Sequence, residues 1–420
     1  MAIVALCRGV NAFPMRPELI LFPLTVLVLV FSSYPALSHS PGEHNPSVHE
    51  DAPIASGASS GLGFNERADA VTVLGELRRA VRLLPDDPDY RLKLAEALLR
   101  IGDLDAAVEE CRAAIKLQPD DANAHLQLGL MLMAKQEWRA AASVLKEAIR
   151  LEPDLPQVHY NIGSVHYSLG DVKAAIQSYR KAIGLQPYFP DAHYRLALLL
   201  KVIGQEREAM QRMEEAAVAG VPQARLFLGN AYQTGQGVEK NLGSAIFWWM
   251  QAADLGQQTA LDSLSKLKRQ TLAPGSTPQR RAELLQGFQA YRNTLWNDFP
   301  AISRPTEHQS LGKILVEQNR GDDAVSILLK ECLALSEEAH DELAVLYETG
   351  WDQYLKPFDK RILSCFESTS AEGFAPAKKL LARIYAKGIG LDADLPKAKA
   401  FLKGLPKQET QSLLDELELH

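Results

Sequence analysis

Three histidines near the start of the sequence have the residue type and the regular spacing of metal ligands. His39, His44 and His49 stand five residues apart, and acidic residues lie beside them. Imidazole nitrogens and carboxylate oxygens are ligands for zinc and copper, so this segment could bind a metal ion weakly. The alternative is a polar linker whose histidines are only solvated. We expect the linker, and we keep metal handling or sensing as the alternative function.

A second row of histidines recurs every 34 residues, at His125, His159 and His193. This regularity is what a ladder of metal ligands would show. Each of the three, however, falls in the apolar phase of a helical pattern, where a histidine usually packs between helices. We therefore expect this row to have a structural role.

Motifs typical of catalysis and of nucleotide binding are missing from the sequence. It contains no phosphate-binding Gly-Lys-Ser/Thr loop, no nucleophile elbow and no zinc-binding His-Glu-x-x-His. Gly235 and Gly237 resemble part of a nucleotide loop, but they lie between two helical segments, which indicates a turn. The formal net charge of −7 argues against nucleic acid as a partner. We expect no catalytic residues and no cofactor.

The first 38 residues have the features of an export signal. Arg16 precedes the apolar run Leu19–Phe31, and a small-x-small site follows it, with cleavage expected after Ser38. The stretch before Met15 does not resemble a signal, so translation could start at Met15 instead of Met1. The alternative is an uncleaved inner-membrane anchor, because the apolar stretch is barely long enough to span a bilayer. Both alternatives predict an exported protein of the periplasm or cell envelope, and a eukaryotic secretory-pathway adaptor is a further alternative.

Cysteines are few for an exported chain. Cleavage of the signal would remove Cys7 and leave Cys111, Cys332 and Cys365, which do not make a disulfide framework. Cys332 and Cys365 could pair in an oxidising compartment, and the sequence leaves this open. Cys111 falls on the apolar face of a helix, so we expect it in a core.

The strongest pattern in the sequence is an internal repeat of 34 residues. Pro85, Pro119, Pro153 and Pro187 keep this spacing, as do alanines, leucines and glycines at other phases, with Gln136 once in place of glycine. Each unit contains two amphipathic runs, with glycine at the turn, aspartate capping the second helix and proline ending it. Helix pairs of this kind bury their apolar stripes only by stacking. We therefore predict an all-α solenoid of antiparallel helix pairs.

These units resemble the tetratricopeptide repeat family. The resemblance rests on Leu128-Gly129, on Ile162-Gly163, on the phased alanines and on the terminal prolines, and it covers Asp87 to Gly220. It implies a right-handed superhelix whose concave face binds a protein or peptide partner.

After Gly220 the sequence resembles the Sel-one-like repeat, a related unit with a longer loop between its helices. One unit extends from Ala224 to Gly256, and two more extend from Ala339 to Gly373 and from Ala377 to Leu402. In the middle unit, Trp351–Pro357 replaces the second loop glycine, which leaves its loop geometry open.

Trp248 and Trp249 are neighbours in the second helix of the first Sel-one-like unit. Adjacent side chains on a helix point in different directions. We expect one of the two rings to be inside and the other to be exposed.

A tether and a hinge complete the expected organisation. The tether, residues 39–65, has too few apolar side chains to pack, so we expect it to be disordered. If the solenoid has two lobes, we expect the hinge near residues 270–305. The expected parts are a signal peptide or membrane anchor (1–38), a disordered His/Pro/Gly/Ser-rich tether (39–65), a capping helix (66–86), tetratricopeptide repeats (87–220), a Sel-one-like repeat (221–268), a linker and helix (269–305), a degenerate helical repeat (306–338), two Sel-one-like repeats (339–405) and a C-terminal helix (406–420).

The repeat register indicates which side chains of each first helix face the groove. Tyrosines in the third and fourth units offer contact area at low entropic cost, and amides and cations there can bind a peptide backbone or a carboxylate. Family members that grip a C-terminal carboxylate use a clamp of Lys and Asn, which Asn161 and Arg195 match. Leu126, Leu130 and Asp191 do not match it, so we do not expect a receptor for chaperone tails. The candidate partner-binding residues are Asn123, Gln127, Tyr160, Asn161, Tyr167, Tyr194, Arg195 and Lys201.

We expect a non-catalytic scaffold or adaptor that binds a peptide or protein in its concave groove. Exported bacterial proteins that combine these two repeat types often serve secretion or exopolysaccharide assembly, and the resemblance implies such a role here. The alternative that we favour least is an enzyme whose active site lies between two lobes.

Overall fold

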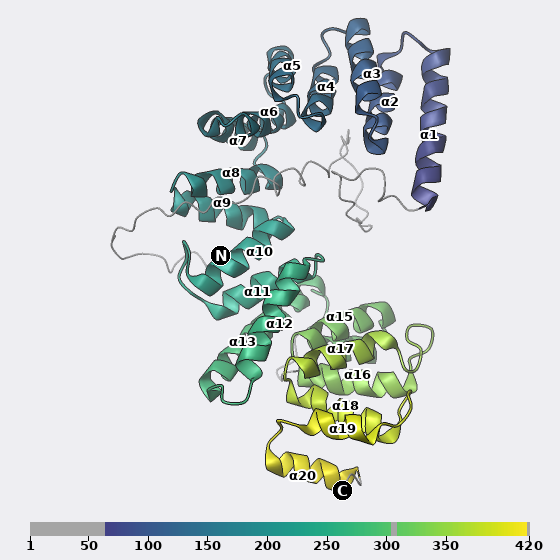
Figure 1. Cartoon of the computed structure of the whole chain (residues 1–420), viewed down its shortest axis with the longest axis vertical. Helices are drawn as coiled ribbons and strands as arrows, with labels where there is room; N and C mark the ends of the chain where they lie inside the picture. Colours follow the sequence, from purple (N-terminus) through teal and green to yellow (C-terminus); the bar gives the residue numbers. More distant parts are fainter. Residues whose placement is uncertain (1–63, 304–308, 418–420) are drawn as a thin grey trace. The chain divides into compact units, whose positions relative to one another are not determined.

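The computed structural model describes residues 64–303 and 309–417. Within these residues the regular secondary structure is helical, apart from an isolated bridge between Trp351 and Leu355. The all-α fold class is therefore confirmed. The chain divides into two compact units, residues 1–171 and 172–420, and Figure 1 labels the helices of each.

The first unit contains helices that pack against their neighbours along the chain. α2 packs with α3 and α4 with α5, and α3 and α5 in turn contact the helix that follows each of them. Stacked helix hairpins result, with a continuous apolar core from Leu74 to Val165. The helices are α1 (Phe64–Leu83), α2 (Pro88–Ile101), α3 (Leu104–Leu117), α4 (Ala122–Ala134), α5 (Trp138–Leu151) and α6 (Pro156–Ser168).

Aspartates begin several of these helices, because a carboxylate can accept hydrogen bonds from main-chain N–H groups that have no partner in the first turn. The side chain of Asp87 accepts from the N–H groups of Asp89 and Tyr90 at the start of α2. Asp103 accepts from the N–H of Ala106 at the start of α3, as predicted.

The turn inside each strict repeat requires a left-handed backbone. Gly102, Gly170 and Gly204 have φ angles of 85°, 84° and 79°, a region that glycine enters without steric cost. Gln136 stands at the same repeat position and has a φ of 61°. The repeat therefore imposes its turn geometry even where glycine is replaced.

The 34-residue row of histidines ties each first helix to the loop before it. Nε2 of His125, His159 and His193 lies 3.0, 2.7 and 2.9 Å from the main-chain carbonyl oxygen of the proline six residues earlier. A carbonyl only accepts hydrogen bonds, so in each of these contacts the ring donates through Nε2. This row has the structural role that we expected.

The second unit begins with α7 and continues the pattern of hairpins. α8 packs with α9, α10 with α11, α14 with α15 and α18 with α19. The helices are α7 (Val172–Leu185), α8 (Pro190–Val202), α9 (Glu206–Val218), α10 (Pro222–Thr234), α11 (Leu242–Ala253), α12 (Gln258–Leu272), α13 (Pro278–Leu295), the short 3₁₀ helix η3 (Trp296–Asp298), α14 (Leu311–Glu317), α15 (Gly321–Leu333), α16 (Glu337–Thr349), α17 (Lys360–Ala371), α18 (Ala375–Lys387), α19 (Leu395–Leu402) and α20 (Lys407–Glu416).

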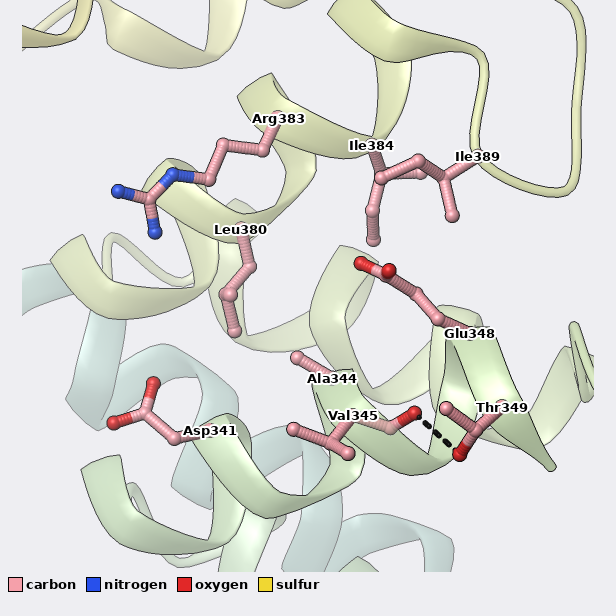
Figure 2. A pocket seen from close by; sticks show the side chains of 9 residues that line it. All are labelled: Asp341, Ala344, Val345, Glu348, Thr349, Leu380, Arg383, Ile384 and Ile389. Carbon is pink, nitrogen blue, oxygen red and sulfur yellow. Dashed lines mark hydrogen bonds between the residues drawn. The ribbon is translucent and has the colours of Figure 1, made fainter. Parts of the chain in front are cut away.

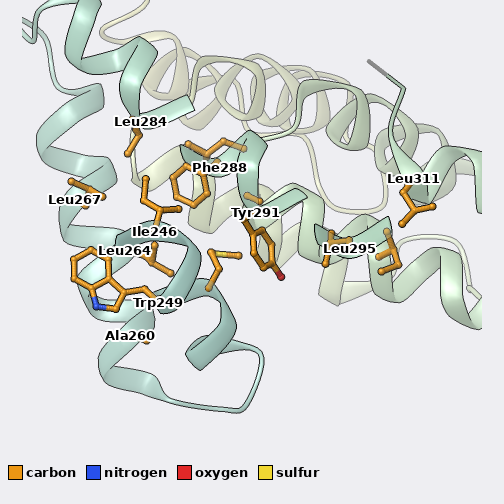
Figure 3. Packing of buried hydrophobic residues seen from close by; sticks show 14 of the residues in the cluster. Ile246, Trp249, Ala260, Leu264, Leu267, Leu284, Phe288, Tyr291, Leu295 and Leu311 are labelled. Carbon is orange, nitrogen blue, oxygen red and sulfur yellow. The ribbon is translucent and has the colours of Figure 1, made fainter. Parts of the chain in front are cut away.

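The predicted hinge near residues 270–305 is wrong, because this segment belongs to a core. Phe288 and Tyr291 of α13 are fully buried and share an apolar cluster with Trp249 of α11 and Leu311 of α14 (Figure 3). The structure divides the chain between Asp171 and Val172 instead. Helix α13 presents enough apolar surface to pack on α11.

The expectation that one of two adjacent tryptophans is exposed is also wrong. Trp248 is 9% exposed and Trp249 is fully buried, with its Nε1 donating to Oδ1 of Asn230 at 3.0 Å. The two rings belong to different apolar clusters. Helix α11 is covered on two sides, so residues that point in different directions both find a core.

The question of cysteine pairing is decided by packing. Cys332 of α15 and Cys365 of α17 form a disulfide, with their Cα atoms 6.6 Å apart. Cys111 is fully buried as expected, and burial raises the pKa of its thiol to about 12. A thiol with so high a pKa is unreactive at neutral pH.

Candidate functional site

The predicted partner-binding residues of the first unit lie on α4 and α6, the first helices of two repeats, which contact each other. Asn123 is exposed and Gln127 is half-buried on α4, while Tyr160 and Tyr167 are half-buried on α6. A half-buried tyrosine is already held by its own fold, so binding through it costs little side-chain entropy. Aromatic and amide side chains of two neighbouring helices are thus partly exposed in this unit.

Asn161 is placed differently from these four residues. It is 8% exposed, and its Nδ2 donates to the main-chain carbonyl of Gln157 at 2.9 Å. This bond engages the amide nitrogen that a clamp on a peptide backbone would use.

The predicted residues of the second unit lie on α8, where they meet an aromatic side chain that the sequence reasoning missed. Tyr194 and Leu198 of α8 and Phe227 of α10 are half-buried around one apolar cluster. The Nζ of Lys201 lies 4.4 Å from the centroid of the Phe227 ring, within the range of a cation–π interaction. Burial raises the pKa of the Tyr194 hydroxyl. Aligning Ala224–Leu228 with Ala192–Leu196 of the unit before would have placed Phe227 at the position of Arg195.

Arg195 is 9% exposed, and its charge acts on a nearby carboxyl group. Burial raises the pKa of Asp191, and the positive charge of Arg195 opposes that rise. An acidic group of a partner would therefore compete with Asp191 for the Arg195 guanidinium. Lys201, which is exposed, is the more accessible cation of α8.

A pocket of about 320 Å³ lies between α16 and α18, the first helices of two successive hairpins of the second unit. Figure 2 shows apolar side chains from both helices between two carboxylates of α16. No prediction from the sequence included this pocket. Its lining residues are Asp341, Ala344, Val345, Glu348, Thr349, Leu380, Arg383, Ile384 and Ile389.

The one cation among the pocket's lining residues is held by the C-terminal helix α20. Nε and Nη2 of Arg383 lie 3.1 and 3.0 Å from the two carboxylate oxygens of Glu416. Such a two-point contact fixes the guanidinium plane. The other charged lining residues, Asp341 and Glu348, are acidic.

A buried ion pair elsewhere in the second unit serves the fold. Nζ of Lys268 lies 2.9 Å from Oε2 of Glu372 and donates to the main-chain carbonyl of Leu333 at 2.7 Å. Ser265 donates to the other oxygen of Glu372. Burial lowers the pKa of Lys268, and the charge of Glu372 opposes that shift. These contacts join α12 to α15 and to the end of α17.

His340 is a second buried polar group of this region. Its Nδ1 lies 2.6 Å from the carbonyl oxygen of Ser336, and its Nε2 lies 3.0 Å from Oγ1 of Thr369. Burial lowers its pKa to about 4, so the ring is neutral at physiological pH. Its position on α16 between two other helices gives it a packing role.

The predictions about metal binding and membrane anchoring concern residues that lie mostly outside the described part of the chain. Among residues 64–303 and 309–417, no group of three or more His, Cys, Asp or Glu side chains could hold a metal ion. Nor does this part of the chain contain a helix long and apolar enough to cross a membrane. The candidate ligands His39, His44 and His49, the signal or anchor and most of the tether lie outside the described residues.

Two repeat families match the hairpins of this chain. The model of the tetratricopeptide repeat matches residues 58–122 and 126–190, and the model of the Sel1 repeat matches residues 222–257 and 375–403. The chain carries tetratricopeptide repeats and Sel1 repeats. Both families are generally non-catalytic interaction modules. The middle hairpin, α16 and α17, lies outside the Sel1 matches, so its assignment as a Sel1 repeat stays a prediction.

Solved structures of repeat proteins are similar to part of the chain. The crystal structure of MamA is 24% identical with a TM-score of 0.34, covering 39% of this chain and 98% of that one. YrrB, a tetratricopeptide repeat protein with an unusual peptide-binding site, is 20% identical with a TM-score of 0.35, covering 44% and 96%. PilF of Pseudomonas aeruginosa is 20% identical with a TM-score of 0.41, covering 49% and 93%. These likenesses do not bear on function. No curated protein sequence matches the chain.

Proposed function

We propose that this protein is a non-catalytic scaffold or adaptor of the cell envelope that binds a peptide or protein on its first-helix surfaces. Its tetratricopeptide and Sel1 repeats support a role in protein–protein interaction. The observation that carries the proposal is the surface of α8 and α10, where the exposed Lys201 lies over the ring of Phe227 and shares a helix face with Tyr194 and Leu198. Aromatic side chains beside a cation are typical of interface hot spots.

The chemistry of this surface favours a peptide with both an apolar and an acidic group. Tyr194 and Phe227 can bury an apolar side chain, and Lys201 can pair with a carboxylate at the edge of that contact. Because Lys201 is exposed, the ion pair would contribute modestly and would weaken with salt. The apolar contact would supply most of the affinity.

Affinity capture from an envelope extract tests this assignment. A double variant, Tyr194→Ala with Lys201→Gln, removes one ring and one charge from the surface. The matched control is Tyr188→Ala with Lys173→Gln, because Tyr188 is 71% exposed in a loop and Lys173 is exposed on α7. We expect partners lost by the first variant and kept by the control. Identical partner lists for both variants would refute the surface.

The proposed location in the envelope rests on two supports. One is the apolar segment Leu19–Phe31 followed by a small-x-small site ending at Ser38. The other is the disulfide between Cys332 and Cys365, because disulfides persist mainly in oxidising compartments. Within the envelope, we propose secretion or exopolysaccharide assembly as the process that the scaffold serves.

Mass spectrometry of the protein purified from its own cells tests the location. A mature chain that begins at His39 and carries one disulfide would support export with cleavage. A full-length chain in the membrane fraction would support the anchor. A full-length chain in the cytosolic fraction with both thiols free would exclude export.

A further inference from the structure

We propose that the pocket between α16 and α18 is a second binding site, which takes an apolar side chain of a peptide flanked by lysine or arginine residues. This site goes beyond the surface of α8 and α10, and its partner chemistry is opposite in charge. The proposal rests on the shape of the pocket, on its apolar lining and on the charges at its ends.

The centre of the pocket is apolar. Ala344 and Val345 of α16 face Leu380 and Ile384 of α18, and Ile389 of the following loop completes the lining. Val345 is 58% exposed although it is a large apolar side chain. A volume of about 320 Å³ is at the lower end for a ligand site, which suits one or two amino-acid side chains better than a whole small molecule.

Two carboxylates lie at opposite ends of this apolar centre. Asp341 and Glu348 stand seven residues apart on α16, and Figure 2 shows Ala344 and Leu380 between them. Seven residues of α-helix span about 10 Å. In an extended peptide, alternate side chains point to the same face, and four residues span about 13 Å. Two basic side chains four positions apart, with an apolar side chain midway, would therefore lie on one face, and their flexible stems could reach both carboxylates.

The cations near the pocket leave its negative charge largely in place. Arg383 is engaged by Glu416 of α20 through two nitrogen–oxygen contacts. Arg383 and, more weakly, Lys313 act on Asp341 through their electrostatic fields, and Glu338 acts with the opposite sign. A peptide with basic groups would therefore find carboxylates that still lack a close cationic partner among the lining residues.

The environment of Asp341 is consistent with this reading. Burial raises its pKa, and the negative charge of Glu338 raises it further, while the charges of Arg383 and Lys313 lower it less strongly. The carboxylate has thus lost part of its hydration without receiving a close cation in return. A lysine or arginine from a peptide would supply that cation, whereas an acidic peptide would add repulsion.

Fluorescence anisotropy on the full chain tests the proposal with short labelled peptides amidated at their C-termini. The probe is Gly-Lys-Ser-Leu-Ser-Lys-Gly, with Gly-Glu-Ser-Leu-Ser-Glu-Gly and Gly-Lys-Ser-Ser-Ser-Lys-Gly as comparisons. We expect the first to bind more tightly than either comparison. Adding salt should weaken its binding, because the ion pairs at the pocket ends are partly exposed.

Two pocket variants separate charge from apolar contact. Asp341→Asn with Glu348→Gln should weaken the probe about three- to tenfold, as expected for two partly exposed ion pairs. Val345→Ser should weaken the probe and leave the salt dependence unchanged. The matched control, Asp322→Asn with Asp352→Asn, removes two exposed carboxylates outside the pocket and should bind as the wild type does.

Several outcomes would overturn the proposal. Equal binding of the lysine and glutamate peptides, or equal weakening by the pocket variant and its control, would exclude a basic partner in this pocket. A dimer of the chain that dissociates on Asp341→Asn with Glu348→Gln would assign the pocket to a second copy. Circular dichroism checks that every variant is folded. The variant Tyr194→Ala with Lys201→Gln should bind the probe normally, so failure here is distinct from failure of the α8–α10 surface.

Discussion

Two residues of this protein are held by the fold in a state that they would not adopt in the unfolded chain. One state is a backbone conformation and the other is a protonation state. Gln136 adopts a left-handed conformation where the neighbouring repeats have glycine. Buried His340 is held neutral among α15, α16 and α17, with contacts to Ser336, Thr369 and Cys332. In the first case the fold determines the backbone conformation of a residue, and in the second it determines the protonation of a side chain.

Replacing Gln136 by glycine should stabilise the first unit. A non-glycine residue in the left-handed region costs about 1–2 kcal/mol, and glycine returns about 0.5–1 kcal/mol of this as extra unfolded-state entropy. We expect the free energy of unfolding to rise by about 0.5–1 kcal/mol, measured by urea denaturation. The control is Gly170→Ala, which should lower it, since a Cβ there meets no atom within 4 Å and only the backbone is strained. A loss of stability in Gln136→Gly would contradict this account.

Acid should destabilise the second unit through His340. Its folded pKa of about 4 is below the value of about 6.5 expected in the unfolded chain. Between pH 6.5 and 4 the unfolded state therefore binds more protons, so stability is lost as pH falls, by up to about 1.4 kcal/mol per pH unit. In His340→Gln this slope should be absent. Parallel pH profiles of wild type and variant, obtained by urea denaturation, would be inconsistent with a buried neutral histidine.

At the scale of helices, the contacts that join elements differ between the two units. In the first unit, successive hairpins stack through small alanines and leucines of one apolar core. In the second unit, helices that are not neighbours in sequence are also joined by a disulfide and by a buried ion pair. The Cys332–Cys365 disulfide connects α15 to α17, and the Lys268–Glu372 pair connects α12 to the end of α17. These links supplement a repeat pattern that has become irregular.

Removing the disulfide should destabilise the second unit. It closes a loop of 33 residues, for which the loss of unfolded-chain entropy predicts about 3–4 kcal/mol of stabilisation. We expect Cys332→Ala with Cys365→Ala to lower the free energy of unfolding by roughly that amount in urea denaturation. Cys111→Ala is the control, because it removes a buried thiol of the other unit and should leave the transition of the second unit in place. A double variant no less stable than this control would show that the disulfide contributes nothing.

At the scale of the whole molecule, the chain consists of two compact units, and their boundary lies inside the third strict repeat, between α6 and α7. The core of the first unit ends at Val165. The two main apolar clusters of the second unit begin at Ala245 and at Val325. Stability in repeat arrays is a sum of local terms between neighbours. The molecule is therefore not expected to unfold as one cooperative body.

Denaturation of the full chain should show more than one transition. Gln136→Gly should shift one transition upward, and loss of the Cys332–Cys365 disulfide should shift a different one downward, because the two sites lie in different units. Circular dichroism at increasing urea measures both shifts. One two-state transition that moves with both changes would contradict two separately stabilised units.

The sequence by itself determined the repeat and the helix ends. Proline, glycine and aspartate act on the backbone within a few residues of themselves, so their 34-residue spacing predicted the hairpins of the first unit and the turn at Gln136. The same register predicted the structural role of the histidine row and the burial of Cys111. The position of the surface on α8 followed from the register too, although its binding role stays a prediction.

Only the tertiary structure decided which distant helices meet. The pairing of Cys332 with Cys365, the burial of both Trp248 and Trp249, and the packing of α13 into a core depend on contacts across many residues. The pocket between α16 and α18 likewise combines side chains from two hairpins and a loop. Periodicity shows which face of a helix is apolar, but not which other helix covers that face or where two helices leave a gap.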